Sequence, residues 1–253
     1  MKKLYLIGNM KMNMSYGELE TYLEKIVPVA ENTNNVVGVC LPYVYINLAK
    51  YMLEGSKVLY GAENMHQEDK GAYTGEISAD MLNDFNCDLV IIGHSERREY
   101  FHESDELVNL KVKKALEKGL TPILCFGETL DERNNNLAHS VVERQLIKAL
   151  EDISEEDINR IIFAYEPVWA IGTGVSATSK QAEEMISFAK RTILGEFDNA
   201  TPIVLYGGSL KASNAEEILN EPSIDGGLIG GACLKIDEFS QIINTKVDLW
   251  KKL

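Results

Sequence analysis

The chain has 253 residues, of which 45% are hydrophobic and 25% charged, so one large packed core is possible. Its formal net charge of −14 argues against nucleic-acid binding, which needs basic surface to neutralise phosphates. No apolar run is long enough to cross a bilayer, and the four cysteines are scattered without a Cys-x-x-Cys pair. We therefore expect a cytoplasmic protein with reduced thiols, no membrane partner and no zinc site.

Short apolar runs along the chain predict eight β-strands. The expected strands are Met1 to Gly8, Val36 to Leu41, Val58 to Ala62, Leu89 to Ile92, Ile123 to Phe126, Ile161 to Tyr165, Ile203 to Tyr206 and Gly227 to Ile229. These runs are continuously apolar rather than alternating, as is typical of parallel strands that are covered on both faces.

Helices are predicted between these strands. Ser15 and Glu18 form a capping box ahead of an apolar face, and Pro28 predicts the end of that helix. The other expected helices are Tyr43 to Leu53, Ser104 to Gly119, Leu137 to Leu150, Thr178 to Gly195 and Asp237 to Ile243. The polar segment from Glu63 to Ile77 is predicted to be a long loop, and such loops in compact domains are usually functional.

The alternation of strands and helices predicts the fold class. Eight strand–helix units in about 250 residues match the size of a (β/α)8 barrel. No linker or shift in composition divides the chain, so we expect one α/β domain, a (β/α)8 TIM barrel, over residues 1–253.

One stretch after the sixth predicted strand combines several functional features. Glu166 stands at the end of the strand, and Pro167 holds it in an extended conformation because a residue before proline disfavours the α region. Apolar residues including Trp169 follow, and then Gly172 and Gly174, which allow close approach to a ligand. This pattern indicates a fixed carboxylate base beneath a closing lid.

In such a barrel, functional residues lie at the carboxyl ends of the strands. Lys11 follows the first strand, His94 the fourth and Glu166 the sixth. Together they could transfer a proton next to a carbonyl, with the glutamate as base and the other two stabilising the negative charge on oxygen. Glycine turns at 207–208 and 230–231 favour a phosphate site, so we expect a small phosphorylated carbonyl compound as substrate.

Other motifs are weaker. The stretch from Gly172 to Ala177 formally fits a dinucleotide fingerprint, but it does not directly follow a strand. No group of His, Asp and Glu has convincing metal-ligand spacing. We therefore expect neither a cofactor nor a metal.

With these residues identified, the chain resembles the triosephosphate isomerase family over essentially its whole length. The motifs that carry the resemblance are Asn9-x-Lys11-Met-Asn13, Gly71 to Ser78, Gly93 to Arg98, Ala164 to Gly174, Tyr206 to Ser209 and Gly230 to Ala232.

The resemblance implies interconversion of dihydroxyacetone phosphate and glyceraldehyde 3-phosphate through an enediolate, without cofactor or metal. It implies that Glu166 moves the proton and that His94 polarises and protonates the oxygens. Enzymes of this family are a standard example of a glutamate base paired with a neutral histidine. It further implies that Lys11 and Asn9 hold the substrate and that Glu96 positions Lys11.

The resemblance also implies how the phosphate is bound and enclosed. Backbone groups at four positions would receive the phosphate: Gly172, Ser209, Gly230 and Gly231. The lid would run from Pro167 to Ala177 and include Trp169, Thr173 and Gly174. Glu128 and Tyr206 match positions that hold the open and the closed lid respectively.

The loop around Thr74 matches one that inserts beside a partner's active site, so the resemblance implies a homodimer. The chain departs from the family pattern at Met10, Glu63, Val175 and Cys233, none of which is a reacting residue. Two alternatives stay open from the residues alone. One is another phosphosugar isomerase or epimerase on the same barrel, and the other is a non-enzymatic binder of phosphate ligands.

Overall fold

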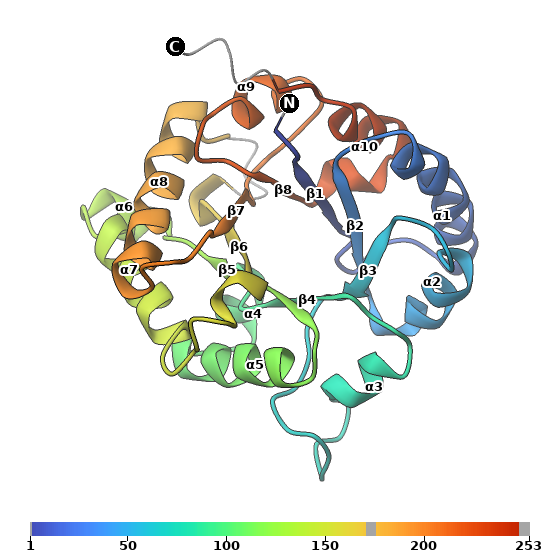
Figure 1. The fold of residues 1–253 in the computed structure, drawn as a ribbon, viewed down its shortest axis with the longest axis horizontal. Coiled ribbons are helices and arrows are strands. Elements are labelled where there is room, and N and C mark those ends of the chain that lie inside the picture. Colours follow the sequence, from blue (N-terminus) through green and yellow to red (C-terminus); the bar gives the residue numbers. More distant parts are fainter. Residues whose placement is uncertain (1, 171–175, 248–253) are drawn as a thin grey trace.

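The computed structural model describes residues 2–170 and 176–247, which form a closed barrel of parallel strands in chain order (Figure 1). The strands are β1 (Tyr5–Asn9), β2 (Val36–Leu41), β3 (Leu59–Ala62), β4 (Leu89–Ile92), β5 (Thr121–Phe126), β6 (Ile162–Tyr165), β7 (Ile203–Tyr206) and β8 (Gly226–Ile229). β1 pairs with both β2 and β8, and this pairing closes the ring. The predicted (β/α)8 fold is confirmed.

Helices surround the barrel as an outer ring (Figure 1). The α-helices are α1 (Tyr16–Glu31), α2 (Ile46–Met52), α3 (Ala79–Asn83), α4 (Ser95–Tyr100), α5 (Asp105–Glu117), α6 (Leu130–Asn134), α7 (Ala138–Ala149), α8 (Ser179–Glu196), α9 (Ala215–Leu219) and α10 (Ile236–Ile243). Short 3-10 helices are η1 (Tyr43–Tyr45), η2 (Ile158–Arg160), η3 (Val168–Ala170) and η4 (Gly231–Leu234).

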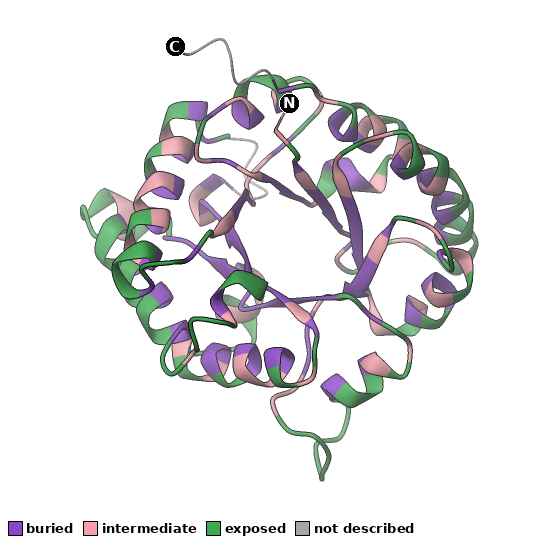
Figure 2. Cartoon of the chain, in the orientation of Figure 1, coloured by how far each residue is buried: buried purple, intermediate pink, exposed green. Residues whose placement is uncertain are grey.

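Two apolar cores follow from the alternation of side chains along each strand. One set points into the barrel and packs as a compact inner cluster: Ile7, Cys40, Leu89, Ile91, Ile123, Cys125, Ile162, Ala164, Leu205 and Leu228. The alternate strand residues, such as Leu6, Val90 and Phe163, join the larger cluster beneath the helices. Figure 2 shows the strands buried and the outer faces of the helices exposed. The barrel interior is therefore filled, and a ligand site can form only at a rim.

The predicted helix starts are confirmed by their caps. The capping boxes pair Ser15 with Glu18 at α1 and Thr178 with Gln181 at α8. Ser104 accepts a hydrogen bond from the N–H of Leu107 at the start of α5. Such caps satisfy N–H groups that the first turn of a helix leaves without partners.

Two predicted helix ends are wrong. Pro28 lies inside α1, which continues to Glu31, because Ala30 extends the buried face and holds the last turn against the core. Gly195 lies inside the last turn of α8, which continues to Glu196 and is followed by the buried Phe197. Tertiary packing outweighed the local preference at both positions.

Short helices were missed by the sequence analysis. α3, α4, α6 and α9 each span five or six residues, which is too short to show a helical apolar period. The expected helix from Tyr43 begins as the 3-10 turn η1 before α2. α4 matters most for function because it begins immediately after His94.

The segment between β3 and α3 has no regular structure among residues 63–78, as predicted, and protrudes from the barrel at the bottom of Figure 1. All four cysteines are free and buried. None of the helices in the described part of the chain has the length and apolarity needed to cross a membrane.

Candidate active site

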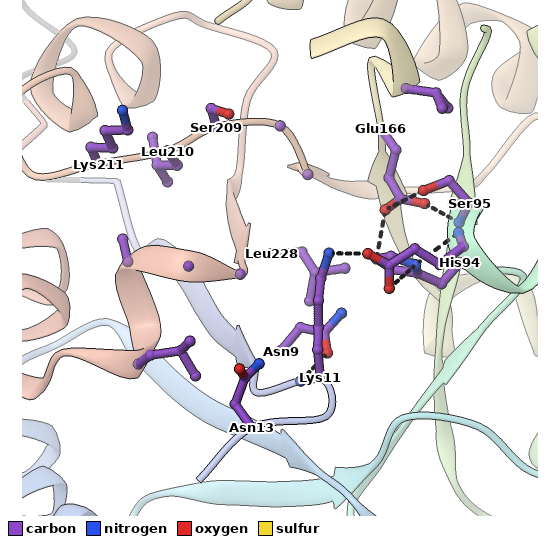
Figure 3. A pocket seen from close by; sticks show the side chains of 18 of the residues that line it. Asn9, Lys11, Asn13, His94, Ser95, Glu166, Ser209, Leu210, Lys211 and Leu228 are labelled. Carbon is purple, nitrogen blue, oxygen red and sulfur yellow. Dashed lines mark hydrogen bonds and ion pairs between the residues drawn. The ribbon is translucent and has the colours of Figure 1, made fainter. Parts of the chain in front are cut away.

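A pocket of about 690 Å³ opens at the carboxyl ends of the strands (Figure 3). The predicted site residues that line it come from five strand ends: Asn9, Lys11, His94, Glu96, Glu166, Ser209, Gly230 and Gly231. Parallel strands bring these ends to one rim, so residues more than 200 positions apart in the chain share one cavity.

Glu166 is 1% exposed and is held on one side of the pocket. Its Oε2 accepts a hydrogen bond from the main-chain N–H of Ser95 at 2.8 Å. Its Oε1 lies 2.9 Å from Nε2 of His94. Its own N–H donates to the carbonyl of Phe126 at 2.7 Å, which continues the strand direction into the site. The carboxylate is thus fixed in direction and largely shielded from bulk water.

His94 is 6% exposed and caps α4. Its Nδ1 accepts a hydrogen bond from the main-chain N–H of Glu96 at 3.2 Å. A ring nitrogen that accepts carries no proton, so the proton of the neutral ring lies on Nε2, which faces Glu166. The imidazole can therefore donate a hydrogen bond into the pocket while uncharged.

The two buried groups shift each other's pKa. Burial lowers the pKa of His94, but the charge and hydrogen bond of Glu166 raise it, and the net shift is upward. Burial raises the pKa of Glu166, but the charge and hydrogen bond of His94 and the N–H of Ser95 lower it, and the net shift is downward. The upward shift of the histidine pKa depends on the carboxylate staying beside the ring. If Glu166 turns toward a substrate, that contribution is lost and the neutral ring is favoured.

Lys11 extends into the pocket, where its Nζ lies 2.5 Å from Oε1 of Glu96 (Figure 3). Its backbone has φ of +50°, a left-handed conformation that side chains other than glycine rarely adopt. Asn9, 5% exposed, supports this turn by accepting the N–H of Lys11 on Oδ1 at 3.1 Å. The chain therefore holds an ammonium group in the pocket at the expense of backbone strain.

The glycine turn after β7 lets two elements come close together. A Cβ on Gly207 would lie 3.0 Å from Cγ of Glu166, and one on Gly208 would lie 2.3 Å from the hydroxyl oxygen of Tyr206. Ser209 follows, and its Oγ donates to the carbonyl of Ala170 at 3.1 Å. Glycine is required here by space, because a side chain would displace the carboxylate or the tyrosine.

The turn after β8 lies beside Lys11. A Cβ on Gly230 would be 3.5 Å from Cε of that lysine, and Gly231 has open space around it. The two glycine turns therefore border the pocket opposite His94 and Ser95, as Figure 3 shows for Ser209. Their lack of side chains leaves main-chain N–H groups accessible to an anion.

Glu128 anchors the start of the proposed lid from a fully buried position. Its Oε1 accepts from Nε1 of Trp169 at 2.8 Å, from Arg133 at 2.8 Å and from the hydroxyl of Tyr165 at 3.1 Å. The Arg133 guanidinium also stacks over the indole ring at 4.8 Å. One carboxylate thus holds Trp169 in place and has its charge balanced by an arginine.

Other predicted residues lie around the pocket or away from it. Pro167 packs toward the glycine turn after β7, and Tyr206 is fully buried beneath that turn. Gly172, Thr173 and Gly174 were predicted as lid residues and lie outside the described residues. Thr74 is exposed on the protruding loop and does not line the pocket.

Sequence reasoning missed several contributors to the site. Ser95 supplies the N–H that holds Glu166, and Arg133 with Tyr165 completes the environment of Glu128. A serine that directly follows His94 at a helix start was a possible signal for the first. The arginine and tyrosine contacts join separate elements and leave no local pattern.

The family model described as triosephosphate isomerase matches residues 4–246. The triosephosphate isomerase of Alkaliphilus metalliredigens is 47% identical over 247 residues, covering 96% of this chain and all of the relative. That of Clostridium tetani is 43% identical over 249 residues, covering 97% of this chain and 98% of the relative. Among the described residues, no group of three His, Cys, Asp or Glu side chains could hold a metal ion.

Proposed function

The chain belongs to the triosephosphate isomerase family and interconverts dihydroxyacetone phosphate and glyceraldehyde 3-phosphate, and from that premise we propose how its residues divide the reaction. The observation that carries the proposal is the meeting of Lys11, His94 and Glu166 in one pocket bordered by glycine turns. A non-catalytic binder would not need a shielded carboxylate base in that position.

Glu166 is the base. It must first leave the N–H of Ser95 and turn toward the substrate carbon next to the carbonyl. There the carboxylate takes a proton, the C–H electrons form a carbon–carbon double bond, and the carbonyl oxygen becomes negative. Return of the proton to the neighbouring carbon completes the isomerisation. Because Gly207 has no side chain, the turn after β7 leaves room beside the carboxylate, where a Cβ would lie 3.0 Å from Cγ of Glu166.

His94 and Lys11 stabilise the enediolate. When Glu166 turns away, the Nε2–H of His94 loses its partner and becomes available to the substrate oxygens. It can give its proton to one oxygen and recover one from the other, so that the hydroxyl and carbonyl exchange places. The ammonium of Lys11 lies between the turn after β8 and Glu96 and favours negative charge in the pocket.

The phosphate is received by main-chain N–H groups at Ser209, Gly230 and Gly231, with Gly172 of the lid as a further donor. The lid, Pro167 to Ala177, then excludes water, which protects the enediolate from losing phosphate. In the described part of this segment, Trp169 stays bound to Glu128 and Ala170 to Ser209. The hydrogen bond from Trp169 to Glu128 would be given up when the lid closes over substrate.

The direct test is a coupled assay of glyceraldehyde 3-phosphate isomerisation with the purified chain, performed with and without a chelator. We expect turnover that the chelator does not change. Folded protein without turnover would refute the proposed activity, and loss of turnover with the chelator would favour a metal-dependent phosphosugar enzyme.

We further propose a homodimer. The loop of residues 63–78 protrudes from the barrel, and exposed apolar residues lie on it and on the two preceding strand loops: Met12, Val44 and Tyr73. Several buried oxygens in this region have no hydrogen-bond partner, including Oε1 of Glu63 and Oε1 of Gln67. A second copy could cover the apolar groups and supply donors, with Thr74 at the contact.

A cytoplasmic location and a place in sugar breakdown and synthesis are also part of the proposal. Four free, buried thiols suit a reducing compartment. Fractionation of the source cells followed by activity measurement tests the location.

A further inference from the structure

The acidity of the chain raises a problem for its substrate. The formal net charge is −14, and the substrate phosphate carries nearly two negative charges at neutral pH, because its second pKa is about 6. A field of this sign repels an approaching anion unless local charges reverse it at the pocket. The positions of the charged side chains around the pocket therefore bear on how an anionic substrate can approach it.

The acids of α4 and two lysines stand on opposite sides of the pocket. Glu96 and Glu99 of α4 stand on the side of Glu166, away from the glycine turns. Lys211 follows the turn after β7, and Lys235 follows η4 after β8, so both stand on the side of those turns. Figure 3 draws Lys211 next to Ser209, across the cavity from His94 and Ser95.

These two lysines are exposed, and their ammonium groups have no ion pair or hydrogen bond within the described part of the chain. The contrast with Lys11 is clear, since Lys11 is paired with Glu96. Glu238 also lines this side, three residues after Lys235, but forms no ion pair with either lysine among the described residues. Both ammonium groups are thus exposed to solvent at the mouth of the pocket, without a partner among the described residues that would neutralise them.

We propose that Lys211 and Lys235 are steering residues that attract the phosphate of the substrate and turn it toward the glycine turns before the lid closes. The proposal rests on the proposed isomerase function and adds a step that precedes chemistry. The two acids of α4 on one side, and two lysines against the single Glu238 on the other, give the mouth a charge asymmetry. The asymmetry favours entry with the phosphate toward Ser209 and Gly230 and the carbonyl toward His94. Neither lysine is a catalytic residue.

The experiment measures kcat/KM for glyceraldehyde 3-phosphate from about 20 mM to 300 mM ionic strength. The variants are Lys211→Gln, Lys235→Gln and the double variant, with Lys3→Gln as matched control. Lys3 is an exposed lysine before β1, at the opposite end of the barrel, and its replacement changes the net charge equally.

At low salt we expect each pocket variant to lose about fivefold in kcat/KM, the size of one unit charge acting on a dianion across water. The loss should be larger in the double variant and shrink toward none at high salt, where the Debye length is short. kcat should stay unchanged, and the Lys3→Gln variant should behave as wild type. Glyceraldehyde without phosphate should show no difference among the proteins.

Two results would overturn the steering proposal. The first is a double variant with the salt dependence of wild type. The second is an equal loss for the phosphorylated and the unphosphorylated substrate, which would indicate a structural defect. Because the wild type is assayed in parallel, failure of steering is distinguished from failure of the proposed isomerase function, which would appear as absence of turnover in the wild type itself.

Discussion

The indole Nε1 of Trp169 donates to Oε1 of Glu128 at 2.8 Å, so a residue at the start of the proposed lid is tied to a buried carboxylate of the barrel. We predict that Glu128→Gln weakens this tie, since the amide keeps the shape but loses the charge that pairs with Arg133. Stability should fall by about 1–3 kcal/mol, as for other hydrogen bonds to charged groups.

The tie can be followed by fluorescence. The chain has two tryptophans, so a Trp250→Phe background leaves Trp169 as the reporter. We expect the emission of the Glu128→Gln variant to shift to longer wavelength. Unchanged emission and unchanged urea midpoint would show that Glu128 does not hold the indole in solution.

Replacement of the proposed base should remove turnover without unfolding the protein. In Glu166→Gln, the amide oxygen can still accept the N–H of Ser95, so we expect a native circular dichroism spectrum. We expect kcat to fall by ~10²–10⁴ or more, because general base catalysis is commonly of that size. Glu20→Gln, on the exposed surface of α1, is the control of equal charge change. A variant with near-normal kcat would remove Glu166 from the mechanism.

The same variant should change the titration of His94. The carboxylate raises the pKa of the ring while burial lowers it, so removal of the charge leaves burial dominant. We predict a lower His94 pKa in Glu166→Gln than in wild type, with Nδ1 the unprotonated nitrogen in both. Two-dimensional ¹H–¹⁵N spectra of the imidazole across pH 5 to 9 measure both quantities. An equal pKa in the two proteins would contradict the coupling described for the pair.

Glu63 should destabilise the folded chain at neutral pH. Burial raises the pKa of its carboxyl from 4.5 to about 8, and its Oε1 has no hydrogen-bond partner. Between these pH values the unfolded chain releases a proton that the folded chain retains, so the free energy of unfolding falls as pH rises from about 4.5 to 8. Below 4.5 both states hold the proton and the cost is absent.

We therefore predict that Glu63→Gln is more stable than wild type at pH 7 by roughly 1–3 kcal/mol, with the difference vanishing near pH 4.5. Urea denaturation at fixed protein concentration over this pH range is the measurement. A constant difference across the range would mean that ionisation of Glu63 is not its cause.

The protruding loop should govern assembly. We predict that Thr74→Arg weakens the proposed dimer, because a bulky charged group at a contact must be desolvated. Sedimentation velocity over a dilution series should show dissociation at higher concentration than for wild type. Thr21→Arg, on the exposed face of α1, is the control and should leave the dissociation constant unchanged. An identical series for all three proteins would argue against Thr74 at the interface.

The fold was predictable because its signals are local. Each strand is a short apolar run, and caps such as Ser15 and Thr178 mark helix starts within four residues. The helix ends predicted at Pro28 and Gly195 were wrong because the packing of buried neighbours outweighs the local preferences of proline and glycine. Helices as short as α4 have no period to detect.

The site was predictable in part for a similar reason. Lys11, His94 and Glu166 follow predicted strand ends, and the barrel brings such ends together. The main-chain donor at Ser95 and the guanidinium of Arg133 could not be found in this way, because their roles depend on the directions of groups from different elements. The lack of an ion pair at Lys211 within the described part of the chain likewise depends on where carboxylates from other elements lie in the folded structure.

Three of the four thiols are sealed inside the protein, so their chemical reactivity reports transient opening of the structure. Cys40, Cys125 and Cys233 have no exposed surface, and burial raises the pKa of each. An alkylating reagent can therefore reach them only when the barrel transiently opens. The rate at which each thiol of the native protein is labelled therefore measures how often β2, β5 or η4 opens, with no engineered cysteine.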